Sequence, residues 1–268
     1  MTITPFRWAG AKNKLLPAIS GYLDPLLNNA TEYCEPFIGG GSVTLYVAQK
    51  YPNIQLYIND KDEWISSFWS VILDFSKLTD LLQLMQTQPT VELFYKLRVE
   101  APTSDVDKAY RAIFFNRCSF SGIVDRRTGP IGGAEQKSKY TVDCRYNFKK
   151  LKEKILQCHE LLKNRTIIYN KSFVDFEPLT KTNMSCYCDP PYFYKSDHLY
   201  YEKMNVDKHF LLSYVLNRRK NWILSYDDVD MIKNVFYKDC KIVNLSANYC
   251  INGIKKNWNQ KNELLILS

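Results

Sequence analysis

Short apolar runs rich in valine, isoleucine and tyrosine recur along the chain, each about as long as a β-strand. They occupy residues 32–38, 54–59, 166–170, 184–188, 221–226, 241–245 and 263–267. Helical periodicity separates several of them, at residues 42–50, 61–74, 207–218 and 228–236. Strands that alternate with helices predict an α/β fold with a mostly parallel sheet and helices on both faces. Residues 246–261 have little helical pattern, so the strand that follows them is predicted to run antiparallel.

One segment interrupts this alternation between the second and third predicted strands. Residues 76–164 have helical periodicity at both ends and, between them, the loop SGIVDRRTGPIGGAEQKSKY at residues 121–140. We therefore predict two domains: an α/β domain formed by residues 1–75 and 165–268, and an inserted, mostly helical domain formed by residues 76–164.

The net charge of +8 comes from the inserted part of the chain. Residues 96–165 hold 16 lysines and arginines against 8 aspartates and glutamates, whereas the rest of the chain has 20 of each. Such a local excess of positive charge favours a polyanion such as nucleic acid as the partner. An ordinary solvated helical face is the alternative.

The opening stretch and the cysteines limit the class of protein. MTITPFRWAG has no apolar signal region, and no stretch reaches about 18 apolar residues, which predicts a cytoplasmic protein without a membrane segment. The eight cysteines form no C-x-x-C pair, and with three histidines they give no zinc pattern, so no metal site is expected. Cys186 and Cys188 are predicted to be small buried residues on one face of a strand.

Three consecutive glycines follow the first predicted strand in YCEPFIGGGSV (33–43) and precede a helix. Glycine allows a tight turn close to a ligand, and a helix N-terminus offers free N–H groups. The spacing is neither that of a dinucleotide fingerprint nor that of a phosphate-binding P-loop. One strand later, LYIND places Asp60 where an acid can bind the ribose of a nucleoside. An ordinary loop or capping aspartate is the alternative.

Two further stretches carry candidate chemistry. In FRWAGAKNKLLP (6–17), a tryptophan, a glycine and Lys12 precede an apolar helix, so they could cover a ligand and neutralise a carboxylate. A capped helix with an exposed lysine is the alternative. In CYCDPPYFY (186–194), two prolines end a predicted buried strand because proline has no backbone N–H.

The residues at that strand end are Asp189, Pro190, Pro191 and Tyr192. The carboxylate and the next main-chain carbonyl can accept two hydrogen bonds from one amino group, while the tyrosine can stack on a flat heterocycle. Such a pocket would hold the exocyclic amine of a base that has left its duplex stack. A strand-ending turn with a chance aspartate is the alternative.

Together these motifs resemble the Dam-like (class alpha) DNA adenine-N6 methyltransferases. RWAGAK, EPFIGGGS, the inserted FNRCSFSGI and DPPY occur in the family's order and cover the chain nearly end to end. The resemblance implies a Rossmann-like, seven-stranded methyltransferase sheet with an inserted DNA-recognition domain. It also implies site-specific transfer of a methyl group from S-adenosylmethionine to N6 of adenine in a short duplex site, by base flipping and direct in-line transfer.

The resemblance also assigns roles to residues. The catalytic residues would be Asp189, Pro190, Pro191 and Tyr192. The residues around the cofactor would be Trp8, Gly10, Lys12, Glu35, Pro36, Phe37, Gly39, Gly41, Asp60, Phe173, Asp175 and Asp189. The residues that meet DNA would be Asn116, Arg117, Ser119 and Ser121, and the nearby Arg126, Arg127, Lys137 and Lys139 could reach phosphates or guanine edges. The expected partners are double-stranded DNA and, in a restriction-modification system, a cognate restriction endonuclease, with a bacterial or phage source.

Several alternatives remain open. Family members that read GATC carry a tyrosine- or phenylalanine-Asn-Gly arrangement where this chain has SFSGIVDRRTGPIGG, so the recognition sequence is left open at a short site that contains adenine. Amino methylation of cytosine uses the same chemistry, but those enzymes usually carry serine in place of Asp189. A catalytically idle DNA-binding module is another alternative. A nicotinamide oxidoreductase is disfavoured by the consecutive glycines.

Overall fold

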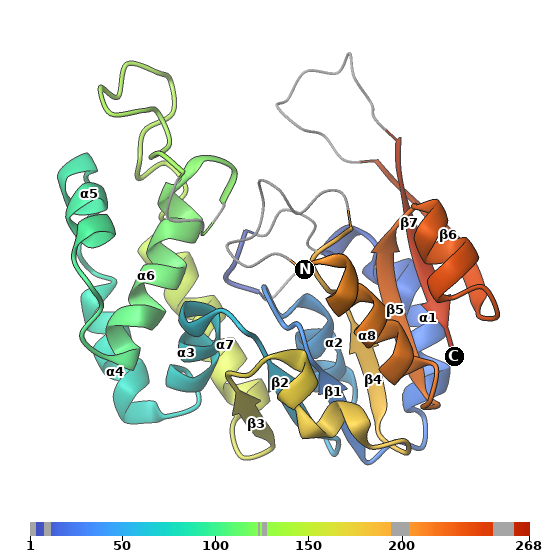
Figure 1. Cartoon of the computed structure of the whole chain (residues 1–268). Helices are drawn as coiled ribbons and strands as arrows, with labels where there is room; N and C mark the ends of the chain where they lie inside the picture. The colour runs from blue at the N-terminus through green and yellow to red at the C-terminus, as the bar shows by residue number, and fades with distance from the viewer. Residues whose placement is uncertain (1–3, 8–11, 123, 125–127, 194–203, 249–259) are drawn as a thin grey trace.

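The computed structural model describes residues 4–7, 12–122, 124, 128–193, 204–248 and 260–268. A seven-stranded sheet in the order β3-β2-β1-β4-β5-β7-β6 forms its centre (Figure 1). The strands are β1 (Glu32–Glu35), β2 (Gln55–Asn59), β3 (Thr166–Tyr169), β4 (Ser185–Cys188), β5 (Trp222–Asp227), β6 (Lys241–Asn248) and β7 (Gln260–Leu267). β1 to β5 pair in parallel, whereas β7 runs antiparallel to β5 and β6. The predicted α/β class and the final antiparallel strand are confirmed.

Eight α-helices are assigned in the described part of the chain. Around the sheet lie α1 (Leu16–Leu27), α2 (Ser42–Lys50), α3 (Glu63–Val71) and α8 (Val206–Leu216). Between β2 and β3 come also α4 (Phe75–Leu84), α5 (Val91–Val99), α6 (Asp105–Cys118) and α7 (Phe148–Leu162). Figure 1 shows α4, α5 and α6 beyond the β3 edge of the sheet, whereas α7 contacts α2. The helices α3 to α8 each begin after an Asp, Thr, Ser or Asn whose side chain accepts a backbone N–H of the first turn.

Several predicted bounds differ from the observed ones, mostly by one to three residues. The first strand ends at Glu35 rather than at residue 38, because Pro36 has no N–H for the ladder. The helix expected at residues 228–236 is reduced to one π-helical stretch, η6 (Ile232–Phe236). The loop after β1 therefore begins at Pro36, whereas β2 and β4 end at Asn59 and Cys188 as predicted.

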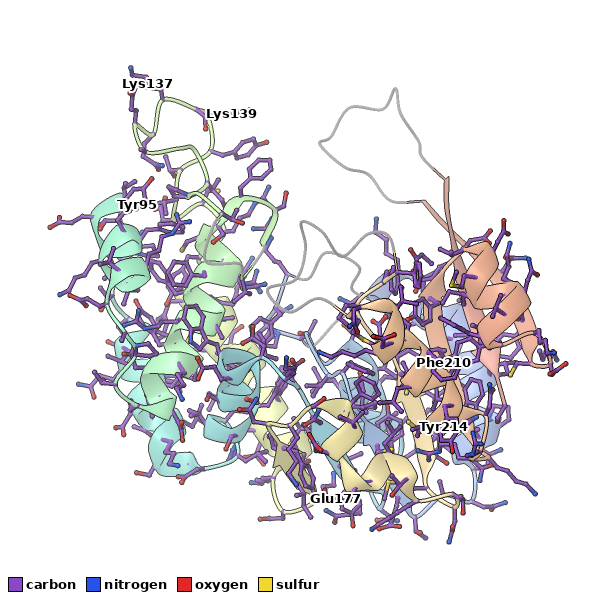
Figure 2. The ribbon with its side chains drawn as sticks, viewed as in Figure 1. Tyr95, Lys137, Lys139, Glu177, Phe210 and Tyr214 are labelled. Atoms are coloured by element: carbon purple, nitrogen blue, oxygen red, sulfur yellow. The ribbon has the colours of Figure 1, made fainter. Side chains whose placement is uncertain are left out.

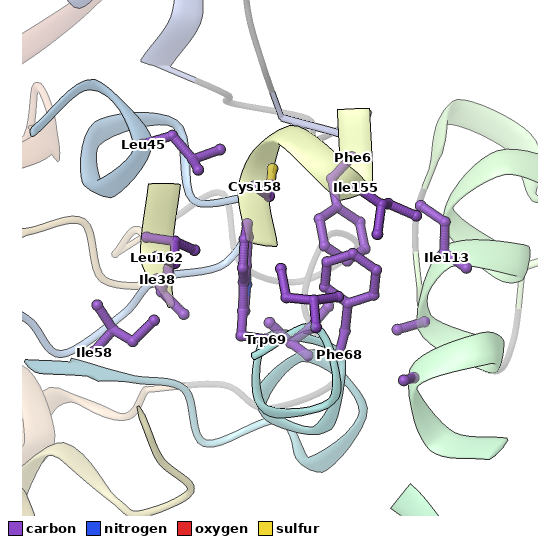
Figure 3. Close-up of a cluster of buried hydrophobic side chains, with 14 of the residues drawn as sticks. Phe6, Ile38, Leu45, Ile58, Phe68, Trp69, Ile113, Ile155, Cys158 and Leu162 are labelled. Carbon is purple, nitrogen blue, oxygen red and sulfur yellow. The ribbon is translucent and has the colours of Figure 1, made fainter. Parts of the chain in front are cut away.

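The hydrophobic core is continuous between the sheet and the inserted helices. Figure 3 shows Phe68 and Trp69 of α3 packed with Phe6, Ile113 of α6 and Ile155 of α7. The opposite face of the sheet carries a second cluster, which includes residues of β4, β5 and β7. Because α3 belongs to the sheet region and α6 to the insert, the two parts share one core, and the division at residues 76 and 164 stays a prediction.

Candidate active site

The parallel strands β1, β2, β4 and β5 place their carboxyl ends at one edge of the sheet. The strand order reverses between β1 and β4, because β2 lies on one side and β5 on the other. In open α/β sheets, ligands bind in the crevice outside such a reversal point. The glycine loop after β1 and the DPPY stretch after β4 therefore lie on the two sides of the expected ligand crevice.

Asn59, the last residue of β2, joins three strand ends. Its buried amide nitrogen donates to the carbonyls of Pro36, at 2.9 Å, and of Lys171, at 3.0 Å. Its amide oxygen accepts from the Lys171 N–H at 2.9 Å. The loops after β1, β2 and β3 are thus tied together by one side chain. The sequence interpretation missed this role. The signal that could have indicated it is a polar residue at the end of a predicted buried strand.

The glycine loop is shaped by residues distant in the sequence. Gly39 and Gly41 have positive φ angles of 46° and 68°, which favour glycine. A Cβ atom on Gly41 would lie 2.4 Å from the ring of Trp69, whose Nε1 donates to the Gly39 carbonyl at 3.0 Å. The Thr4 hydroxyl donates to the Gly40 carbonyl. The motif predicted a tight turn, but it did not show that Trp69 and Thr4 hold the turn in place.

Two candidate cofactor carboxyls lie next to this loop. Asp60 accepts hydrogen bonds from the backbone N–H groups of Gly39, at 2.8 Å, and of Asp62, at 2.9 Å, and burial raises its pKa to about 7. Glu35 is buried and accepts from the hydroxyls of Tyr33, at 2.9 Å, and of Thr44. Burial raises the pKa of Glu35 to about 8, against the lowering effect of those two hydrogen bonds.

The remaining predicted cofactor residues differ in their burial. The rings of Phe37 and Phe173 lie 5.5 Å apart between their centroids, with Phe173 buried and Phe37 half-buried. Pro36 is buried, whereas Asp175 is exposed on the short turn η3 (Phe173–Asp175). Trp8 and Gly10 lie outside the described residues.

Lys12 connects the N-terminal part of the chain to the DPPY stretch. Its ammonium lies 2.7 Å from Oδ2 of Asp189 and 3.2 Å from Oε1 of Glu263, and it donates to the Tyr192 hydroxyl at 2.9 Å. Only 3% of the Lys12 surface is exposed. The alternative of an exposed lysine is therefore wrong. Glu263 lies on β7, and no local motif pointed to it.

The two carboxylate oxygens of Asp189 are in different environments. Oδ2 pairs with Lys12, whereas Oδ1 is enclosed and has no hydrogen-bond partner in the described part of the chain. Burial raises the pKa of Asp189 to about 6, with Lys12 lowering it and Glu263 raising it. The carboxyl is thus largely ionised near neutral pH, and Oδ1 has an acceptor capacity that no described residue uses. Pro190 next to it is buried, and Pro191 is half-buried.

The ring of Tyr192 in the DPPY stretch is held by residues of β5 and α8. Tyr192 stacks on Tyr226 of β5, with ring centroids 6.0 Å apart and an interplanar angle of 26°. The Tyr226 hydroxyl in turn hydrogen-bonds to Nδ1 of His209 on α8. The N–H of Phe193 donates to Asp227 at 3.1 Å. These supporting residues come from α8 and β5, and the sequence interpretation missed them.

The residues predicted to meet DNA are in different environments. Asn116 and Ser119 are fully buried, Arg117 is half-buried and Ser121 is exposed. Burial and the neighbouring guanidinium of Arg7 lower the pKa of Arg117 to about 10.

Figure 2 shows Lys137 and Lys139 at the outer end of the insert, and both are exposed. Arg126 and Arg127 lie outside the described residues. Phe120 follows the C-terminal end of α6 and is 59% exposed, and the sequence interpretation did not single it out.

Among the described residues, no group of three or more His, Cys, Asp or Glu side chains is arranged to hold a metal ion. In the same part of the chain, no helix is long and apolar enough to cross a membrane.

Comparison with known proteins identifies the family. Residues 8–251 match the family of D12 class N6 adenine-specific DNA methyltransferases, so the chain belongs to that family. It is similar to the type II methyltransferase M.MjaIII of Methanocaldococcus jannaschii, with 28% identity over 211 residues, which are 72% of this chain and 70% of the relative. It is also similar to the type II methyltransferase M.CviBI of Paramecium bursaria Chlorella virus NC1A, with 25% identity over 218 residues, 80% and 78% of the two chains.

The family membership settles the class of protein. The resemblance to adenine-N6 methyltransferases is confirmed, and with it the Rossmann-like seven-stranded fold and the class of enzyme, an adenine-specific DNA methyltransferase that acts on DNA. A nicotinamide oxidoreductase is excluded. The roles of individual residues stay predictions, as does a bacterial or phage source, since the two relatives come from an archaeon and a virus.

Proposed function

We propose that this chain transfers the methyl group of S-adenosylmethionine to N6 of an adenine that has been flipped out of a short duplex site. The observation that carries the proposal is Asp189, which follows β4 at the reversal point of the sheet. Its Oδ2 is held by Lys12, and its enclosed Oδ1 has no partner within the described residues. A carboxylate oriented in this way can accept a hydrogen from an amino group.

The residues opposite Asp189 suit a nucleoside cofactor with an amino-acid tail. Glu35 is a buried carboxyl with a raised pKa, so a bound ammonium group would stabilise its ionised form. The glycine loop precedes the N-terminus of α2, and Phe37 and Phe173 form an aromatic pair at which an adenine ring could stack. Asp60 would bind the ribose. When bound there, S-adenosylmethionine would supply an electrophilic methyl group on a positively charged sulfur.

The contribution of the protein to the reaction would be positioning and charge placement. Asp189 and the Pro190 carbonyl would accept hydrogen bonds from the two N–H groups of the adenine amino group and turn its lone pair towards the methyl group. Tyr192 would stack on the flipped base, supported by Tyr226. Direct in-line transfer between two aligned groups gains most of its rate from such preorganisation.

DNA would lie against the insert and the N-terminal part of the chain. Arg7 and Arg117 both have lowered pKa values because they are partly buried. The two guanidinium groups are close enough for the charge of Arg7 to lower the pKa of Arg117, and together they would attract a nearby DNA phosphate. Lys137 and Lys139 could add phosphate contacts at the outer end. Since both relatives are named type II methyltransferases, we include a cognate restriction endonuclease as a partner.

The test is methyl transfer by the purified protein. Unmethylated DNA is incubated with S-adenosylmethionine labelled in the methyl group, and the digested nucleosides are separated. We expect the label in N6-methyladenine. Label in N4-methylcytosine would overturn the target base, and cofactor binding with no transfer to any DNA would instead indicate an idle binding module.

A further inference from the structure

The N-terminal segment (residues 4–7) lies between the glycine loop and the insert. On the loop side, the Thr4 hydroxyl donates to the Gly40 carbonyl. The ring of Phe6 packs edge-on against Phe68, with centroids 4.6 Å apart, and lies 6.0 Å from Trp69 (Figure 3). Trp69 is the residue that donates to the Gly39 carbonyl. The segment therefore supports the glycine loop both directly and through α3.

On the insert side, Asn116 of α6 binds the same segment with its whole amide group. Its Oδ1 accepts from the Arg7 N–H at 2.7 Å, and its Nδ2 donates to the Arg7 carbonyl at 2.7 Å. Nδ2 donates a second hydrogen bond to the Gly122 carbonyl at 2.9 Å. Asn116 is 0% exposed. Both of its donor hydrogens are thus used inside the protein.

Further contacts from the insert fix the rest of the segment. The guanidinium of Arg117 donates to the Pro5 carbonyl, and the ammonium of Lys154 on α7 donates to the Thr4 carbonyl at 3.1 Å. Gly122 has a φ of +73°, and a Cβ atom there would lie only 2.7 Å from the Arg7 carbonyl oxygen. The turn after α6 therefore packs directly onto the segment.

These contacts assign Asn116 a different part in the reaction from the one that its motif implies. We propose that Asn116 is a positioning residue for the cofactor loop and does not read DNA. A residue that reads base edges must present free donors or acceptors to the groove. Asn116 could do so only by breaking buried hydrogen bonds, which would leave backbone groups of Arg7 and Gly122 unpaired at a substantial cost. Through residues 4–7, it makes the shape of the glycine loop depend on the insert.

The inference rests on the proposed function in one respect, namely that the glycine loop holds S-adenosylmethionine. Its test therefore uses two readouts of the loop and one of DNA binding, all on the full-length protein. One is the dissociation constant of S-adenosylmethionine, measured by calorimetry without DNA. The other is hydrogen exchange of the Gly41 N–H, which donates to the Ile38 carbonyl at 2.8 Å and needs no ligand. Affinity for a mixed-sequence duplex, measured without cofactor, reports on DNA contacts.

We expect Asn116→Ala to weaken cofactor binding by roughly tenfold and to speed Gly41 exchange, because the loop loses its preorganised shape. Duplex affinity should stay within about twofold, since no DNA contact is lost. Thr4→Val, which keeps the side-chain shape but removes the hydroxyl, should change both loop readouts in the same direction, so a folding defect specific to Asn116→Ala cannot account for the result. Gln157→Ala is the matched control, because it also truncates an amide side chain but at an exposed position of α7, and it should change neither loop readout.

Two results would overturn the inference. One is weaker duplex binding by Asn116→Ala with unchanged cofactor affinity and unchanged Gly41 exchange, which would make Asn116 a DNA contact. The other is unchanged Gly41 exchange in both Asn116→Ala and Thr4→Val. If the wild-type protein bound no S-adenosylmethionine, the proposed function would fail, while the exchange measurement would still decide whether residues 4–7 support the loop.

Discussion

The carboxyl edge of the sheet and the outer end of the insert differ in how their polar side chains are held. At the sheet edge, Lys12 is nearly enclosed and contacts two carboxylates and a tyrosine hydroxyl. At the outer end of the insert, the Lys137 side chain is 83% exposed and pairs with the exposed Glu135. Exposed ion pairs of this kind contribute little to stability. The chemistry is therefore preorganised, whereas the surface that would meet DNA can adapt its side chains to the duplex.

The largest effect is expected at the sheet edge, from Asp189→Ala. The substitution removes the acceptor for the adenine amino group and leaves Lys12 with Glu263, so the rate of methyl transfer should fall by at least about a hundredfold. Single-turnover transfer of labelled methyl groups measures this. Asp239→Ala, which removes an exposed carboxylate, should transfer at the wild-type rate. Near-normal turnover by Asp189→Ala would remove Asp189 from the mechanism.

Two glycines with positive φ allow the two regions to be compared directly. Gly41→Ala places a Cβ atom 2.4 Å from Trp69, whereas Gly133→Ala, in the insert, meets nothing within 4 Å. Both substitutions strain the backbone, by about 1–3 kcal/mol. Only Gly41→Ala should also weaken binding of S-adenosylmethionine, by more than about tenfold, because the loop must shift. Calorimetric titration of both variants measures this, and wild-type affinity in Gly41→Ala would show that the loop shape does not matter for cofactor binding.

The pH dependence of methyl transfer should report on Asp189. Its pKa is raised to about 6, so the ionised acceptor is lost as pH falls through that value. With S-adenosylmethionine saturating, so that the cofactor already occupies the site beside Asp60 and Glu35, kcat/KM for DNA should fall by about tenfold per pH unit below that value. Glu263→Gln removes a negative neighbour that raises this pKa, so the acidic limb should move to lower pH while the positive charge of Lys12 remains. An acidic limb at the same pH in both proteins would contradict the assignment to Asp189.

The smallest effects are expected at the exposed end of the insert. Lys137→Ala and Lys139→Ala should each weaken duplex binding only a few-fold and reduce the slope of log affinity against log salt by about one per lost phosphate contact. Affinity measured over a series of salt concentrations tests this. Lys238→Ala, an exposed lysine outside the insert, serves as the control. An unchanged slope would mean that Lys137 and Lys139 face solvent in the complex.

The contrast also explains how much could be predicted from the sequence. The alternation of strands and helices gave the fold, and the motifs GGG and DPPY marked two strand ends, because these signals are local. The long-range contacts that hold the site in place could not be predicted, because they join positions far apart in the sequence. They link Lys12 to Glu263, Thr4 to Gly40, and Arg7 to Asn116. Asn116 shows the same limit in another way. Its motif implied a DNA contact, but a motif does not reveal whether a side chain is buried.

The most direct test of the account compares DNA from cells that express the wild-type protein with DNA from cells that express Asp189→Ala, by sequencing that detects methylated bases. The account predicts N6-methyladenine at one short motif with the wild-type protein and none above background with the variant. N6-methyladenine at that motif in both samples would contradict the central role of Asp189. Methylation of cytosine, or of no base, by the wild-type protein would contradict the proposed reaction.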